Sequence, residues 1–127
     1  MTIENAIKRC DNINSNSFET SVKIDFLSKL DAYIKSEVID NFELNEGETE
    51  TEFTGYDEDT SLKTELLVCS PYDDIYENFL IAQVYLMLGE NSKYNNYISI
   101  YNTILDEYKK YYTRTHKHKK NTEFVFW

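Results

Sequence analysis

Apolar side chains recur at helical spacing in four stretches of the chain, separated by polar segments. The first stretch, over residues 2–10, begins with Thr2, whose hydroxyl is suited to cap the first turn of a helix. The second stretch, over residues 20–41, has an apolar stripe with Lys and Asp/Glu assigned to the opposite face. That stripe consists of Ile24, Leu27, Leu30, Ile34, Val38 and Phe42. Both patterns predict amphipathic helices.

The third stretch, residues 70–89, has signals for a start and a stop. Ser70 is suited to cap a helix that begins at Pro71, where the missing N–H costs nothing, and Gly89 is suited to end it. Because the residues between are apolar almost all round, we expect this helix to be central.

The fourth stretch predicts a helix capped by Ser92, with an apolar stripe stepping by three and four residues. The stripe consists of Tyr94, Tyr97, Tyr101, Ile104, Tyr108 and Tyr111. The short link after Gly89 makes the last two helices an antiparallel hairpin. The tyrosines are expected in the core with hydroxyls at its rim, and a subunit surface is the alternative. Five residues are expected to share one core: Leu30, Ile34, Phe79, Ile104 and Leu105.

The segment between the second and third stretches is acidic and lacks a helical period. It carries eight carboxylates over residues 43–59, together with Gly47 and Gly55. We therefore expect residues 43–62 to lie mostly outside helix. Alternating Thr and aromatic residues around Phe53, followed by the apolar run 65–68, leave room for a short β-hairpin. The expected fold is mainly α: a small four-helix domain with an acidic excursion loop.

Composition supports one helical domain. A chain of 127 residues with 3 Gly and 1 Pro is poor in the turn residues that many-stranded β proteins need. We assign residues 1–113 to a helical domain and 114–127 to a basic and aromatic C-terminal tail. No apolar run approaches the roughly 20 residues that span a bilayer, and no secretory leader pattern is present, so we expect a soluble protein.

Charge is distributed unevenly along the chain. Residues 1–108 carry 22 Asp/Glu against 7 Lys/Arg, whereas residues 109–127 carry 6 Lys/Arg and one acidic residue. Nucleic-acid binding needs clustered cations, so the acidic body argues against a footprint over the whole domain. The basic tail could still contact phosphate.

The sequence contains few candidate catalytic groups. Cys10 lies on an apolar helical face, and Cys69 is expected to be a small buried thiol rather than a nucleophile. His116 and His118 lack the spacing of a zinc site, and the acidic segment lacks the calcium-loop pattern. No phosphate-binding loop or nucleophile elbow occurs. We expect a protein that is not an enzyme and binds no cofactor or metal.

The C-terminal tail is the strongest candidate for a binding element. Lys119 and Lys120 precede four large apolar residues, Phe124, Val125, Phe126 and Trp127. These could fold back on their own domain, but residues 115–121 look like an exposed spacer. We therefore favour docking on a partner, with the basic run on an acidic surface and the aromatic end in a pocket.

The order of several segments resembles a known family of structural proteins. These segments are "TIENAIKRCD", "LSKLDAYIKSEVID", "FTGYDEDTSLKTELLV", "PYDDIYENFLIAQVYLMLGENSKYNNYISIYN" and "YYTRTHK". Over about residues 2–117 the chain resembles the small head-to-tail connector (adaptor) proteins encoded beside the capsid genes in tailed phages and prophages of Gram-positive bacteria. The final "KNTEFVFW" has no match in that pattern.

The resemblance implies a role in the virion. It implies a mainly helical subunit that assembles as a homo-oligomeric ring beneath the portal, contacts portal and tail-side connector proteins, and lets DNA pass through its channel. The expected location is the virion, and the host cytoplasm during assembly. The acidic surface alone supports a different class, a small cytosolic regulatory or inhibitor protein that binds a basic partner or mimics DNA.

Overall fold

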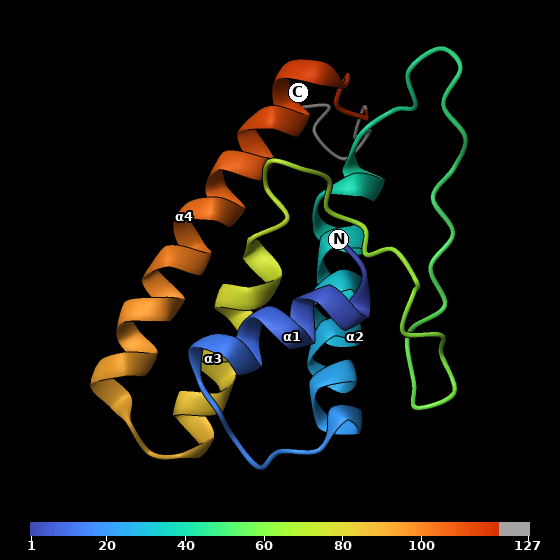
Figure 1. The fold of residues 1–127 in the computed structure, drawn as a ribbon. Helices are drawn as coiled ribbons and strands as arrows, with labels where there is room; N and C mark the ends of the chain where they lie inside the picture. The colour runs from blue at the N-terminus through green and yellow to red at the C-terminus, as the bar shows by residue number, and fades with distance from the viewer. Residues whose placement is uncertain (120–127) are drawn as a thin grey trace, which may run out of the picture.

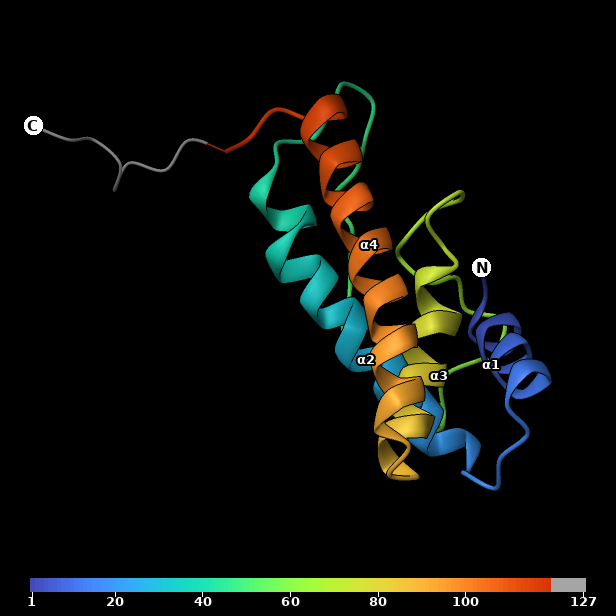
Figure 2. The same cartoon turned by 90° about the vertical axis from the view of Figure 1, so that its left-hand side faces the viewer.

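The computed structural model describes residues 1–119 and is mainly helical (Figure 1). Its helices are α1 (Ile3–Ile13), α2 (Thr20–Glu37), the short 3-10 helix η1 (Ile39–Asn41), α3 (Ile75–Met87) and α4 (Asn91–Thr115). The four predicted α-helices are confirmed. Figure 2 shows α4 running the length of the molecule, as expected for 25 residues, which span roughly 37 Å at 1.5 Å per residue.

Local signals fix some helix ends as predicted. The Thr2 side chain accepts a hydrogen bond from the Asn5 N–H at 3.2 Å and so caps α1. Gly89 ends α3 with a φ of 75°, a conformation that strains other residues. The Gly89 and Glu90 N–H groups then bond the carbonyls of Leu86 and Tyr85, which satisfies the last turn of the helix.

Other helix ends differ from the prediction. Helix α3 begins at Ile75 rather than Pro71, because residues 69–74 form successive turns in which the Tyr72 N–H bonds the Cys69 carbonyl at 2.9 Å. Helix α2 ends at Glu37, and its predicted last turn is the 3-10 helix η1. Helix α4 begins at Asn91, without a side-chain cap, rather than after Ser92.

Helices α3 and α4 form the predicted antiparallel hairpin (Figure 1), and tyrosines of the α4 stripe contact aromatic residues of α3. Tyr101 stacks near Phe79 with ring centroids 5.1 Å apart, and Tyr97 stacks on Tyr85 at 5.7 Å. Tyr101 and Tyr108 are buried. The core assignment of the stripe is therefore confirmed for these two residues.

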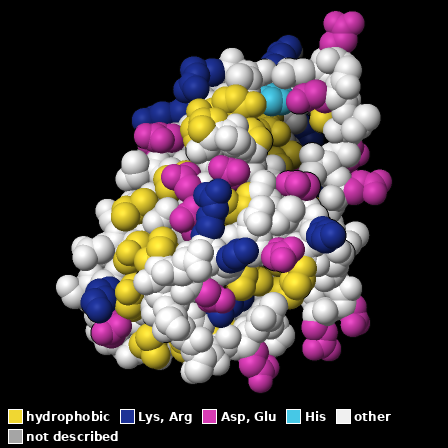
Figure 3. All heavy atoms as spheres, in the orientation of Figure 1, with side chains coloured by type: hydrophobic (Ala, Val, Ile, Leu, Met, Phe, Trp, Pro, Cys, Tyr) yellow, Lys and Arg dark blue, Asp and Glu magenta, His cyan; other side chains and the backbone are white. Residues whose placement is uncertain are grey.

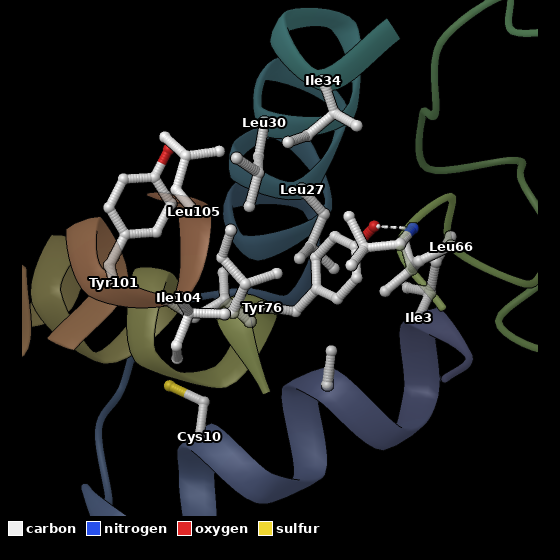
Figure 4. Packing of buried hydrophobic residues seen from close by; sticks show 14 of the residues in the cluster. Ile3, Cys10, Leu27, Leu30, Ile34, Leu66, Tyr76, Tyr101, Ile104 and Leu105 are labelled. Atoms are coloured by element: carbon white, nitrogen blue, oxygen red, sulfur yellow. Dashed lines mark hydrogen bonds between the residues drawn. The ribbon is translucent and has the colours of Figure 1, made fainter. Parts of the chain in front are cut away.

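One hydrophobic core joins all four helices (Figure 4). Leu30, Ile34, Ile104 and Leu105 are buried in it as predicted, whereas Phe79 is only partly buried at its edge. The expectation that α3 is central does not hold for its last turn, where Leu86, Met87 and Leu88 are about half exposed, at 46%, 51% and 53%. Apolar composition alone did not distinguish the buried part of α3 from the end of the hairpin.

Residues 43–62 lie outside helix, as predicted, and run beside α2 (Figure 1). No β-strand occurs within residues 1–119, so the expected short hairpin is absent there. The extended segment around Leu66 instead pairs with the start of the chain. The Ile3 N–H bonds the Thr64 carbonyl at 3.0 Å, and the Leu66 N–H bonds the Met1 carbonyl at 2.9 Å. These bonds use backbone groups that a hairpin partner would otherwise take.

Candidate interaction surface

A buried carboxylate, Asp31 on α2, joins three parts of the fold. The residue is 0% exposed and accepts hydrogen bonds from the Tyr56 and Tyr76 hydroxyls, both at 2.6 Å, and from the Leu67 N–H at 3.1 Å. The Tyr76 hydroxyl in turn accepts the Val68 N–H at 2.7 Å, the bond drawn in Figure 4. The excursion loop, the segment before α3 and α3 itself are thus held to α2.

Burial raises the pKa of the Asp31 carboxyl above its ordinary value, and the three hydrogen bonds oppose that shift without cancelling it. The loop reaches Asp31 through Gly55, whose φ of 95° turns the chain so that the Tyr56 N–H bonds the Ser28 hydroxyl at 3.0 Å. Because every bond to Asp31 comes from its own chain and the side chain is inaccessible, we interpret this cluster as structural.

Sequence analysis assigned Asp31 to the polar face of its helix, which is wrong. The signal that could have placed it was spacing, because Asp31 lies four residues after Leu27 and three before Ile34, on the apolar stripe itself. Lys23 is a second buried charged residue, 3% exposed, and its Nζ lies 2.8 Å from the Asp11 carboxylate on α1.

Part of the basic run that was expected to be an exposed spacer, residues 116–119, contacts the domain. Helix α4 continues to Thr115, so the predicted boundary at residue 113 falls inside it. His116, with a side chain 7% exposed, stacks on Tyr112 at 4.2 Å between ring centroids. Its Nε2 lies 3.0 Å from the Glu48 carboxylate. The Asn45 N–H and His116 together lower the pKa of Glu48.

Residues 117–119 then run antiparallel to residues 41–43. The Glu43 N–H bonds the Lys117 carbonyl at 2.7 Å, and the Lys119 N–H bonds the Asn41 carbonyl at 2.9 Å. The rings of Phe42 and His118 meet edge to face at 5.0 Å. This pairing fixes the position of Lys119, the last residue that the structure describes.

A groove opens beside Lys119. It lies at the end of the molecule where α2 and α4 finish, and Figures 1 and 2 show these two helix ends. Its volume is about 320 Å³, and we call it the exit groove. Phe42 and Leu44 supply apolar surface, while Glu43 and Glu50 supply carboxylates. Leu44 is 54% exposed. Neither Glu43 nor Glu50 has an ion-pair partner within residues 1–119, whereas Asp40 pairs with Lys35.

Of the six predicted binding residues, Lys119 lines the exit groove. The other five lie outside the described residues: Lys120, Phe124, Val125, Phe126 and Trp127. The carboxylates of the excursion loop are exposed over residues 43–50 and 57–59, and acidic side chains gather along that edge in Figure 3.

A second apolar surface lies at the opposite end of the hairpin. It consists of Leu86, Met87 and Leu88, which are 46 to 53% exposed, and we call it the hairpin tip. Sequence analysis did not find it, because the residues were assigned to a buried helix. The C-terminal stop at Gly89 was the available signal, since side chains beside a tight interhelical turn have few neighbours.

The two cysteines differ in environment. Cys10 is buried, as predicted, and burial raises the pKa of its thiol to about 12. Cys69 is exposed, contrary to expectation, because it lies in the turns before α3 rather than in the core. Residues 1–119 contain no cluster of three His, Cys, Asp or Glu side chains that could hold a metal ion.

Comparison with known proteins gives no match: no family model, no curated protein and no solved structure is similar to this chain. Among the described helices, none has both the length and the apolar character needed to cross a membrane. The surfaces at the two ends of the hairpin are therefore the basis for a functional interpretation.

Proposed function

We propose that the chain is a structural subunit of a phage head-to-tail connector, assembling as a ring beneath the portal. The observation that carries the proposal is the placement of contact surfaces at both ends of one long hairpin. The exit groove lies at one end and the hairpin tip at the other (Figure 1). A ring subunit that stacks on a partner needs one surface for its neighbour in the ring and another for that partner.

The chemistry of the two ends suits protein contacts. Exposed apolar patches on a soluble domain mark interaction sites more often than isolated apolar residues do. The hairpin tip groups Leu86, Met87 and Leu88 at the end of α3. In the proposed assembly this tip contacts a stacked partner, the portal or a tail-side connector protein.

The acidic loop fits a ring through which DNA passes. Its carboxylates are exposed over residues 43–50 and 57–59. Facing a channel, such a surface repels phosphate and prevents the passing DNA from binding to the wall. This role requires no reaction, and we propose that the protein is not an enzyme.

The exposed acidic edge is also the observation that favours the second candidate, a cytosolic regulatory protein that binds a basic partner or mimics DNA (Figure 3). The two candidates differ in assembly. A DNA mimic acts as a monomer or dimer and competes with DNA for its target, whereas a connector subunit forms a ring and stacks on a portal.

Negative-stain electron microscopy tests the proposal, with the purified protein alone and with the portal protein encoded beside it. We expect rings, or rings stacked on the portal. Leu88→Asp should abolish stacking without lowering the thermal midpoint, because Leu88 is half exposed. A protein that remains monomeric and leaves the portal bare would overturn the proposal.

A further inference from the structure

We infer that the exit groove binds the C-terminal segment 120–127 of a second copy of this chain. The inference rests on the proposed function in one respect, since it names the neighbour in the ring as the partner. The groove combines apolar surface from Phe42 and Leu44 with the carboxylates of Glu43 and Glu50. Its occupant should therefore be apolar and basic.

The C-terminal segment has that composition. Lys120 supplies a positive charge, and Phe124, Phe126 and Trp127 supply large apolar side chains. A groove of about 320 Å³ is within the range that buries a compact ligand, so it can take a large aromatic side chain as an anchor. Glu43 and Glu50 lack ion-pair partners within residues 1–119, which leaves their carboxylates available to a lysine from outside.

The position of the exit favours a second copy over the chain's own segment. Lys119 already forms part of the groove wall, and its backbone is bonded to Asn41. Phe124 follows five residues later, so an extended chain places it roughly 17 Å beyond the wall of its own groove. Binding in its own groove would require the chain to reverse within residues 120–123. Binding in a neighbour's groove requires no reversal.

The geometry of such a contact has a consequence for assembly. The segment and the groove are different surfaces of one chain, so their contact is heterologous, with each copy giving its segment to the next and receiving one from the last. A heterologous contact closes into a ring when its rotation permits. The proposed ring and this contact are therefore compatible, although either could exist without the other.

Two single variants of the full chain test the contact in complementary fashion. Leu44→Asp places a charge in the groove and leaves the segment intact. Trp127→Ala removes an anchor and leaves the groove intact. Each variant alone should sediment as a monomer, with self-association weakened roughly tenfold or more, as for an interface anchor. An equimolar mixture should form a heterodimer, because one intact segment then meets one intact groove.

Leu62→Asp is the matched control. It changes a leucine that is also exposed, at 41%, but lies outside the groove, and this variant should associate like the wild type.

The outcomes separate this inference from the proposed function. Wild-type protein that is monomeric at every concentration, or a mixture of the two variants that stays monomeric, overturns the inference. Rings that persist in Leu44→Asp overturn it too, while leaving the connector role intact. Association that depends on Leu44 and Trp127, in a protein that forms no ring and does not bind the portal, supports the inference and removes the connector role. Unchanged thermal midpoints in the variants confirm that folding is not the cause.

Discussion

The Asp31 cluster and the exit groove differ in the burial and pairing of their polar groups. At Asp31 a fully buried carboxylate has three hydrogen-bond donors from the same chain, and nothing is left for a partner. At the exit groove exposed carboxylates lie beside exposed apolar surface, and neither Glu43 nor Glu50 forms an ion pair within residues 1–119, although Lys119 also lines the groove. A satisfied buried network holds a fold together, whereas an exposed apolar surface flanked by charged groups is suited to contact with a partner. The comparison predicts that substitutions at the first region change stability and substitutions at the second change assembly.

The largest effect is expected from Asp31→Ala. The substitution leaves the Tyr56 and Tyr76 hydroxyls and the Leu67 N–H without their acceptor inside the protein. Each unsatisfied buried group costs about 1 to 3 kcal/mol, so we expect the free energy of unfolding to fall by roughly 3 to 5 kcal/mol, as for other broken buried networks. Urea unfolding measures the change. Asp25→Ala, on the exposed face of the same helix, is the control and should change stability little. Equal costs at the two positions would contradict the structural role of Asp31.

A comparable loss is expected from Leu30→Ala, which opens a cavity in the core between α2 and the hairpin. Leu30 is 3% exposed, so the substitution should lower the free energy of unfolding by about 2 to 5 kcal/mol. The matched control is Leu44→Ala at the exit groove, where the side chain is 54% exposed and the midpoint should hardly change. A Leu30→Ala midpoint equal to that of the wild type would show that the core is misplaced.

A smaller effect is expected from pH. Because the pKa of Asp31 is raised in the folded protein, the folded state binds more protons than the unfolded state above the ordinary pKa of aspartate. The stability that this carboxyl contributes is fully present below that ordinary pKa and is lost as pH rises through the raised value. The Asp31→Asn side chain cannot titrate. The thermal midpoint of the wild type should therefore fall relative to that of this variant as pH rises across that window. Parallel pH curves would refute the raised pKa.

The smallest effect is expected at the loop contact made by Glu48. This carboxylate accepts the Asn45 N–H at 2.7 Å and faces His116, and its pKa is lowered. Its contribution is present above the ordinary glutamate pKa and is lost as pH falls through the lowered value. Glu48→Ala should leave the global midpoint unchanged and speed amide exchange at Asn45. Glu46→Ala, in the same exposed turn, should not alter that exchange rate.

Sequence patterns predicted the helices well where periodicity and capping agreed. Thr2 and Gly89 mark real helix ends, and the tyrosine stripe of α4 packs as its spacing indicates. The start at Pro71 failed because backbone turns between Cys69 and Ile75 determine that segment, and turn geometry has no period. The buried position of Asp31 was missed because we assigned the residue to the polar face on account of its charge, although its spacing places it on the apolar stripe.

The exit groove was harder to predict from the sequence than the helices were. Lys119, one of the candidate residues named from the sequence, lines the exit groove. The groove itself depends on residues 39–44 and 50–51 meeting the end of the chain, which is a contact between segments far apart in sequence. The packing of His116 on Tyr112 was likewise unpredictable, since a basic run of this kind usually indicates a solvated segment.

The most direct test of the account is deletion of residues 121–127, followed by measurement of both the thermal midpoint and assembly. The account assigns stability to the core and the Asp31 cluster, and assembly to the C-terminal segment acting on the exit groove of another copy. It therefore predicts an unchanged midpoint together with loss of rings and of binding to the portal. A large fall in the midpoint would contradict it, because the segment would then belong to the core of its own chain.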